Sequence, residues 1–151
     1  MTRTHWIGLA AGGSLVLLLA ALAFQYIGGL APCPLCIWQR WPHVGAVALG
    51  PAALLLAGPL LPALGAGVML GGAGIAFYHS GVEQGWWEGP SACAAPDIGG
   101  LTPEELLAQI MAAPIVRCDE IPWEMFGLSM AAWNGLACLA LAGVWLMAAR
   151  G

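Results

Sequence analysis

The stretch 41-WPHVGAVALGPAALLLAGPLLPALGAGVMLGGAGIAFYHSGV-82 contains no Asp, Glu, Lys or Arg. A helix that crosses the ~30 Å hydrocarbon core of a bilayer needs about 20 predominantly apolar residues. This stretch is therefore long enough for two membrane-spanning helices. Gly58 and Pro59 mark the turn between them, because proline lacks a backbone donor and ends helices. We predict these two spans near residues 43–58 and 63–80.

Two further uncharged stretches flank this region. Residues 6–27 are long enough for one span, and residues 125–149 are long enough for another. We predict an all-α integral membrane protein, a four-transmembrane-helix bundle that forms one domain over residues 1–151. An even number of spans places both termini on one side of the membrane. The loops 28–40 and 81–124 then share the opposite side.

The first stretch has an alternative interpretation as a secretory signal peptide, since Arg3 precedes an apolar core and small residues follow it. That core, however, exceeds the 7–15 residues that are usual in signal peptides. We therefore interpret it as a membrane span.

The composition agrees with a lipid environment. Hydrophobic residues make up 60% of the chain and charged residues 8%, with a mean hydropathy of +0.83, whereas soluble domains carry about 25% charged residues. All eight acidic residues lie between Glu83 and Glu124, so the net charge of −4 belongs to one segment. The four basic residues are scattered arginines that divide evenly between the two sides, so they do not orient the chain. Without a basic cluster, we expect no nucleic-acid binding.

The large loop contains a predicted short helix. Thr102 can cap free backbone amides, Pro103 suits the first helical position, and the acids that follow favour the positive end of the helix dipole. Pro114 ends the segment. Its apolar face comprises Leu106, Leu107, Ile110 and Met111. The helix is too short to span a bilayer, and we expect it to lie on the membrane surface. The alternative is a helix packed over the bundle ends.

The five cysteines form the main chemical signal. Cys33 and Cys36 have the Cys-x-x-Cys spacing, and Cys93 and Cys118 lie in the large loop. In the predicted layout, these four cysteines lie on the same side of the membrane. Cys-x-x-Cys pairs are typical of redox sites, because one thiolate can have a lowered pKa and attack a disulfide. Cys138 lies in the last span, where we interpret it as a small apolar residue.

Other interpretations of the cysteines are open at this point. Zinc also binds Cys-x-x-Cys when two such pairs occur, but Cys93 and Cys118 are far apart in sequence and His79 is the only nearby histidine. We therefore expect no metal site. An inert structural disulfide between Cys93 and Cys118 would explain that pair alone. The main alternative is a non-catalytic membrane protein whose cysteines staple its loops or bind metal.

Arg40 lies four residues after Cys36, at the start of the second predicted span. In a helix, residues at this spacing share a face. A guanidinium there would stabilise a thiolate and could donate to a quinone carbonyl. The alternative is an arginine that only reaches the membrane interface.

Three blocks of sequence resemble the DsbB family of disulfide-forming membrane proteins. They read CPLCIWQR at 33–40, YHSGVE at 78–83 leading to GPSAC at 89–93, and CDEIPW at 118–123 followed by FGLSMAAWN at 126–134. The resemblance covers most of the chain between residues 33 and 134, with the blocks in the family's order.

The resemblance implies a multi-pass protein of the bacterial inner membrane, with both termini cytoplasmic and the cysteine loops periplasmic. It implies a bound quinone, either ubiquinone or menaquinone, and a DsbA-like partner with a thioredoxin fold. The route from DsbA through this family to quinone is the known example of how a bacterial periplasm is kept oxidising. The reverse flow, from quinol to thiols, is a third interpretation of the same residues.

The resemblance also implies residue roles. Cys93 would form the mixed disulfide with the partner, and Cys118 would resolve it and exchange with Cys33. Cys36 would be the thiolate that faces the quinone ring, and Arg40 would hold the quinone. His79 and Met130 are further candidates for the quinone pocket.

Overall fold

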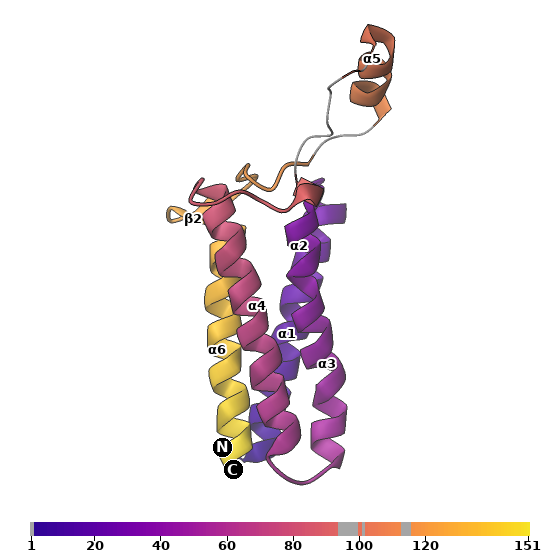
Figure 1. Ribbon diagram of the computed structural model, residues 1–151. Helices are drawn as coiled ribbons and strands as arrows, with labels where there is room; N and C mark the ends of the chain where they lie inside the picture. The colour runs from indigo at the N-terminus through magenta and orange to yellow at the C-terminus, as the bar shows by residue number, and fades with distance from the viewer. Residues whose placement is uncertain (1, 94–99, 101, 113–115) are drawn as a thin grey trace.

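The computed structural model describes residues 2–93, 100, 102–112 and 116–151. Figure 1 shows long helices running side by side, with both termini at one end of the bundle. The long helices are α1 (Arg3–Tyr26), α3 (Arg40–Leu55), α4 (Leu60–Glu83) and α6 (Met130–Arg150). We call the two ends of the bundle the terminal end and the cysteine end, since Cys33 and Cys36 precede α3 at the end opposite the termini.

Within the described residues, three helices are long and apolar enough to cross a membrane, namely α1, α4 and α6. Large apolar side chains such as Leu19, Leu70 and Leu139 are exposed on their outer faces. In water such a surface would be unstable, whereas lipid tails accommodate it. The chain is therefore a helical, multi-pass membrane protein. Helix α3 runs parallel to the others but has only 16 residues.

The last helix begins later than predicted, at Met130 rather than near residue 125. The preceding residues form a hairpin of β1 (Glu124–Met125) and β2 (Leu128–Ser129), which pair antiparallel. The turn uses left-handed backbone at Phe126 (φ 55°) and Gly127 (φ 74°), a conformation that stops helix propagation. Ser129 then caps α6 by accepting a hydrogen bond from the Ala132 amide at 3.2 Å.

The predicted loop 28–40 contains a helical turn that the sequence analysis did not anticipate. Helix α2 (Pro34–Trp38) begins with proline at its first position, where the missing N–H costs nothing. Gln39 separates α2 from α3, which starts at Arg40 rather than near residue 43. Cys36 and Arg40 lie on two successive helices, but Gln39 keeps helical backbone (φ −66°, ψ −19°), and both side chains line the same cavity.

Close packing of small residues holds the terminal end together. Ile7, Ala46 and Met69 form a buried core there with Trp145. A Cβ atom built on Gly65 would lie 2.5 Å from the Trp145 ring, so only glycine lets the ring approach α4 this closely.

The predicted short helix is present as α5 (Pro103–Ala112). The Glu105 carboxylate accepts hydrogen bonds from the Thr102 amide and hydroxyl, at 2.9 and 3.0 Å, which is the expected capping arrangement. These bonds lower the pKa of Glu105. Figure 1 shows α5 beyond the cysteine end, standing clear of the bundle. Leu107 and Met111 are exposed, while the side chain of Ile110 lies outside the described residues. Its position on a membrane surface stays a prediction.

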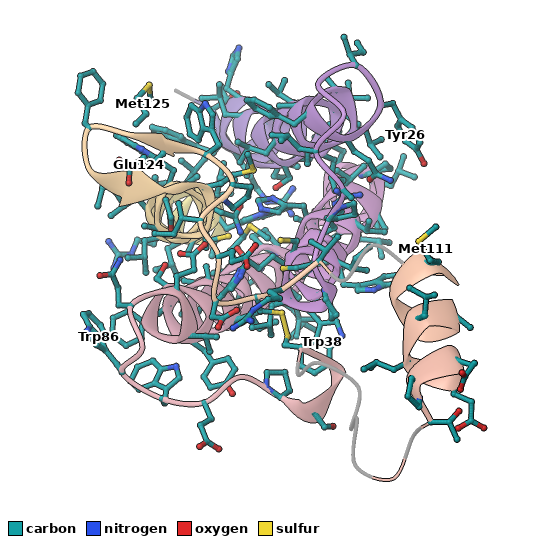
Figure 2. The ribbon with its side chains drawn as sticks, turned by 90° about the horizontal axis from the view of Figure 1, so that it is seen from above. Tyr26, Trp38, Trp86, Met111, Glu124 and Met125 are labelled. Atoms are coloured by element: carbon teal, nitrogen blue, oxygen red, sulfur yellow. A yellow bond between two sulfur atoms is a disulfide. The ribbon has the colours of Figure 1, made fainter. Side chains whose placement is uncertain are left out.

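Figure 2 views the bundle along its axis from the cysteine end. Tyr26, Trp38 and Trp86 lie on the outside and are exposed. Aromatic side chains with a polar edge are typical of the membrane–water boundary. They indicate that the cysteine end lies near the membrane surface.

Candidate active site

The turn of helix α2 sets the geometry of the first cysteine pair. Cys33 is the N-cap residue, and its sulfur accepts a hydrogen bond from the Cys36 amide at 3.1 Å. Both cysteines carry free thiols. Cys33 is 3% exposed, and Cys36 is half-buried. The pair is therefore in its reduced form, held on one helical turn and shielded from water.

The two thiols differ in acidity. The Cys33 thiol donates a hydrogen bond to the Cys36 sulfur, which lowers the pKa of Cys36 below that of an ordinary thiol. The same hydrogen bond, together with burial, raises the pKa of Cys33. The positive charge of Arg40 makes a further, smaller contribution to lowering the pKa of Cys36. Cys36 is thus the sulfur that ionises first.

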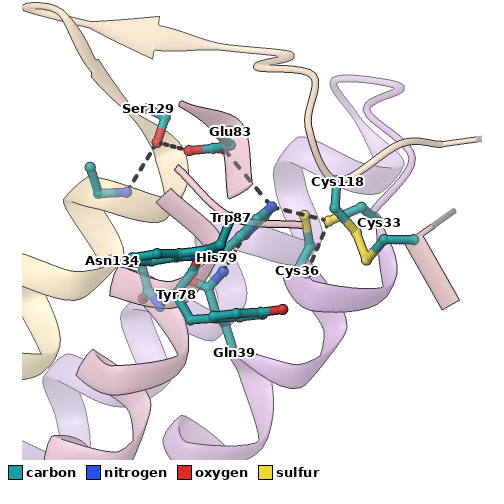
Figure 3. Close-up of polar contacts among 12 residues, drawn as sticks. Cys33, Cys36, Gln39, Tyr78, His79, Glu83, Trp87, Cys118, Ser129 and Asn134 are labelled. Atoms are coloured by element: carbon teal, nitrogen blue, oxygen red, sulfur yellow. Dashed lines mark hydrogen bonds and ion pairs between the residues drawn. A yellow bond between two sulfur atoms is a disulfide. The ribbon is translucent and has the colours of Figure 1, made fainter. Parts of the chain in front are cut away.

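The second pair is a disulfide between Cys93 and Cys118, with their Cα atoms 5.4 Å apart. Cys93 ends the short 3-10 helix η1 (Ser91–Cys93). Cys118 is only 1% exposed and packs in one buried cluster with Cys33 and Leu35. Figure 3 shows Cys118 beside Cys33. The fold thus brings together two sulfur pairs that lie far apart in the sequence.

The two sulfurs of this disulfide face different surroundings. Cys93 is half-buried and lines an open hollow of about 620 Å³, together with Trp86 and Arg117. Arg117 forms an ion pair with Asp119 there, which lowers the pKa of Asp119 and raises that of Arg117. Cys118 lies on the inner side. Both residues pack in the cluster that contains Cys33, but only Cys93 also lines the outer hollow and is reachable from outside.

His79 joins the first pair to the bundle interior. Its Nδ1 atom accepts a hydrogen bond from Gln39 Nε2 at 2.6 Å, so the neutral ring carries its hydrogen on Nε2. That Nε2 atom lies 3.6 Å from Cys33 Sγ and 3.9 Å from a Glu83 carboxylate oxygen. The Ser129 hydroxyl donates to the other Glu83 oxygen. Figure 3 shows this chain of contacts from Ser129 to Cys33.

A line of hydrogen bonds continues inward from Gln39. Asn134 Nδ2 donates to Gln39 Oε1 at 2.8 Å, and His43 Nε2 donates to Asn134 Oδ1 at 2.9 Å. Cys138 Sγ lies 3.5 Å from the same His43 nitrogen, so it contacts a polar partner and not only apolar neighbours. We call Gln39, Asn134 and His43 the polar chain. Each bond points toward His79, which holds its ring in one orientation.

The polar chain is not among the site residues that the sequence predicted. A signal was present, because His43 and Asn134 are polar residues inside uncharged, apolar segments, and polar residues at membrane depth are functional candidates by default. Gln39 was overlooked beside the more conspicuous Arg40.

The cysteine end contains a cavity of about 510 Å³. Its walls are mostly apolar and come from α1, α6 and the segment before β1. The predicted site residues that line it are Cys33, Cys36, Arg40, His79 and Met130. Arg40 donates to Gln25 Oε1 of α1 at 2.7 Å, which holds the guanidinium at the cavity wall. The volume lies within the ~300–1,000 Å³ that is typical of small-molecule sites.

These features define a class of protein. A helical membrane protein carries a buried dithiol beside an apolar cavity, and a disulfide packs against that dithiol from the loop side. Such an arrangement is suited to thiol–disulfide exchange at a membrane boundary.

Comparison with known proteins supports this class. The family model described as "Disulfide bond formation protein DsbB" matches residues 3–148. Disulfide bond formation protein B of Methylococcus capsulatus is 38% identical over 136 residues, covering 83% of this chain and 80% of the relative. The protein of the same name from Dechloromonas aromatica is 32% identical over 142 residues, covering 87% and 82%. No solved structure matches the chain significantly.

The chain belongs to the DsbB family. It is a membrane disulfide oxidoreductase involved in disulfide bond formation, as the sequence blocks predicted.

Proposed function

We propose that this protein reoxidises a DsbA-like periplasmic dithiol oxidase and passes the electrons to a membrane quinone. The observation that carries the proposal is the position of Cys118, which is bonded to Cys93 and packed against Cys33. The disulfide thus lies between the outer hollow, which Cys93 lines, and the Cys33–Cys36 dithiol, which lines the cavity.

The first exchange takes place at Cys93. A thiolate of the reduced partner attacks Cys93, the bond to Cys118 breaks, and Cys118 leaves as a thiolate. The second thiol of the partner then attacks the mixed disulfide, so the partner becomes oxidised and Cys93 is released. The partner loses two electrons and two protons, and the loop pair gains them. The half-buried position of Cys93 supports its choice as the attacked sulfur, because Cys118 is almost fully covered.

The second exchange moves the electrons inward. The Cys118 thiolate attacks Cys33 when Cys33 and Cys36 form a disulfide, and Cys36 leaves as a thiolate. Attack by Cys93 on Cys118 restores the loop disulfide and leaves the inner pair reduced. Cys33 has no S–H to donate during this step, so the positive charge of Arg40 is what favours Cys36 as the leaving thiolate, since a more acidic thiol leaves faster. The described structure has the redox states that follow this step.

The cavity has the chemistry expected for a quinone ring, either ubiquinone or menaquinone. Its apolar walls suit a lipid-soluble ring, while Arg40 and His79 supply polar hydrogens for carbonyl oxygens. Met130 adds a polarisable wall. A bound quinone would accept two electrons and two protons from the dithiol. Because Cys33 is buried and Cys36 is half-buried, soluble thiols and disulfides would have little access to this pair.

We propose four membrane spans in the bacterial inner membrane, with α3 as the span between α1 and α4. At 1.5 Å per residue, the 16 residues of α3 cover about 24 Å. Arg40 at its start can reach the interface, and a short span is tolerated by slight thinning of the bilayer. Because a DsbA-like partner is periplasmic, the cysteine end would face the periplasm and both termini the cytoplasm.

Trapping tests whether Cys93 is the sulfur that exchanges with a partner. In the Cys118→Ala variant, the free Cys93 thiol should attack the disulfide of an oxidised, thioredoxin-like partner, and the mixed disulfide should accumulate because Cys118 is not there to attack Cys93 and release the partner. Non-reducing gels measure the adduct, and Cys138→Ala serves as the control, since Cys138 belongs to neither pair. A protein whose cysteines only staple its loops would form no adduct.

A second experiment tests the acceptor. Purified protein is mixed with quinone and a reduced dithiol partner, and the quinone absorbance is followed. We expect the absorbance to fall with one quinone reduced per partner disulfide formed. Oxidation of the partner without loss of quinone would show that quinone is not the acceptor. No oxidation of the partner would contradict the proposed thiol–disulfide exchange.

A further inference from the structure

The reduced centre contains a cluster of metal-binding atoms. One ligand atom each from Cys33, Cys36 and His79 lies within 4.8 Å of the other two. The Cys33 Sγ and His79 Nε2 atoms are 3.6 Å apart. Zinc–sulfur bonds of about 2.3 Å and zinc–nitrogen bonds of about 2.0–2.1 Å place such ligands about 3.6 Å apart around a tetrahedral ion. The spacing is therefore that of two tetrahedral zinc ligands before an ion enters.

Glu83 can complete the coordination. One carboxylate oxygen lies 3.9 Å from His79 Nε2, and the two side chains are only 2% and 4% exposed. The Ser129 hydroxyl holds the other oxygen. Carboxylate oxygens are accepted zinc ligands beside cysteine and histidine. Two sulfurs and one nitrogen thus form the group of three, and Glu83 lies beside its nitrogen as a fourth ligand whose side chain would have to move toward the sulfurs.

The polar chain supplies the outer support that zinc-bound histidines need. A metal on His79 Nε2 requires the hydrogen to move to Nδ1, and ligating histidines donate this second N–H to a neighbouring acceptor. If the Gln39 and Asn134 amides turn over, each presents its oxygen where its nitrogen now lies. The bonds from His79 to Gln39 and from Gln39 to Asn134 then reverse direction, and the bond between Asn134 and His43 is kept when the hydrogen of His43 moves from Nε2 to Nδ1.

We propose that the dithiol form of this protein binds a thiophilic divalent cation such as Zn²⁺ through Cys33, Cys36, His79 and Glu83. Binding releases the two thiol protons and forms two metal–sulfur bonds, with no electron transferred. The disulfide form has no thiolate to offer, so it does not form the site. The ion is not a structural zinc, since it binds one redox state only.

Selective binding has a thermodynamic consequence. A ligand at 100 times its dissociation constant stabilises the form that binds it about 100-fold. Because a tenfold change in a two-electron equilibrium corresponds to 29.6 mV, the potential of the inner pair would rise by about 59 mV. Its electrons become harder to remove. The metal would therefore hold the enzyme reduced and slow its reoxidation.

Cobalt titration tests the site, because tetrahedral Co²⁺ with thiolate ligands gives strong visible bands. The full chain carrying Cys93→Ser and Cys118→Ser is used, so that the inner pair alone changes with oxidation. The protein reduced with a phosphine should bind one Co²⁺ with tetrahedral bands, and Zn²⁺ should displace it. The oxidised protein should show none. Bands of equal strength in the oxidised protein, or none in the reduced protein, would overturn the proposal.

Single substitutions identify the ligands. Cys36→Ser and His79→Ala should each weaken Co²⁺ binding at least tenfold, whereas His5→Ala, an exposed histidine at the terminal end, should leave it unchanged. Binding that survives His79→Ala at full strength would exclude the site. If the double-serine chain does not fold, the reduced native chain and the same single variants provide the comparison. Metal binding needs neither quinone nor partner, so failure of the electron route would not affect this result.

Discussion

The two ends of the bundle solve different physical problems. At the terminal end, Ile7, Ala46, Met69 and Trp145 form a mostly apolar buried core. At the cysteine end, the interior holds hydrogen-bonded polar groups and a cavity of about 510 Å³. Small residues and a large ring give one end dense packing. The other end is less densely packed, because it contains the cavity and the reactive cysteines.

The comparison teaches how polar groups are tolerated inside a membrane protein. A polar group without a partner is costly in a low-dielectric interior. The polar chain reduces this cost by bonding each member to the next, and His43 Nδ1 is its one buried atom without a partner in the described structure. This separation predicts that stability and chemistry respond to substitutions at opposite ends.

Arg40→Ala should have the largest effect at the cysteine end. A hydrogen bond from a charged group contributes about 1.5–3 kcal/mol, so we expect kcat/KM for quinone to fall about 10- to 100-fold while the fold is retained. Quinone-reduction kinetics and thermal unfolding measure the two properties, with Arg150→Ala at the far end as the control. Unchanged quinone KM and rate would remove Arg40 from the site.

Gly65→Ala should show the opposite pattern. The added methyl group would meet the Trp145 ring, and overpacking of this kind costs about 1–3 kcal/mol. Unfolding in detergent should therefore occur at lower temperature, while the activity of the folded fraction is kept. Gly67→Ala is the matched control, because a Cβ there meets nothing within 4 Å. Equal stability of the two variants would contradict the packing difference.

Ser129→Ala should lower stability by less than Gly65→Ala, at a residue that contacts Glu83 of the candidate site. It removes the cap of α6 and the hydroxyl partner of Glu83, and loss of such a cap typically costs ~1 kcal/mol. Thermal unfolding measures the change against Ser91→Ala, an exposed serine at the start of η1. A variant as stable as the parent would show that the cap contributes nothing.

The smallest expected effect is on the rate of thiol alkylation. Because the pKa of Cys36 is lowered and that of Cys33 is raised, Cys36 should keep its thiolate as the pH falls and react with iodoacetamide at a lower pH than Cys33. The gain is modest, since nucleophilicity falls together with pKa. Mass spectrometry quantifies each cysteine, and Cys33→Ala, which removes the hydrogen-bond donor, should move the Cys36 profile to higher pH. The same pH dependence for both thiols would be inconsistent with a hydrogen bond from the Cys33 thiol to the Cys36 sulfur.

Sequence patterns anticipated much of the secondary structure. Long uncharged stretches predicted the long helices, and Thr102 with Pro103 predicted the start of α5. The hairpin before Met130 was not predicted, because no pattern of apolar and polar residues marks the left-handed backbone at Phe126. Helix α2 was also missed, since its prolines and short length are typical of a loop.

The candidate site shows the same division. The spacing of Cys33 and Cys36 indicated redox chemistry, and the family resemblance selected Arg40, His79 and Met130, which all line the cavity. The polar chain escaped detection because its members come from separate helices and form a line only after the helices pack.

The sequence by itself determined that this protein lies in lipid and that its paired cysteines are the reactive groups, because hydropathy and cysteine spacing are local properties of the chain. Only the tertiary structure decided that Cys118 meets Cys33, that Cys93 faces outward, and that His79 is held in one orientation. Those facts depend on which helices and loops pack together. Such contacts are set by the complementarity of surfaces far apart in the chain, and no local pattern records them.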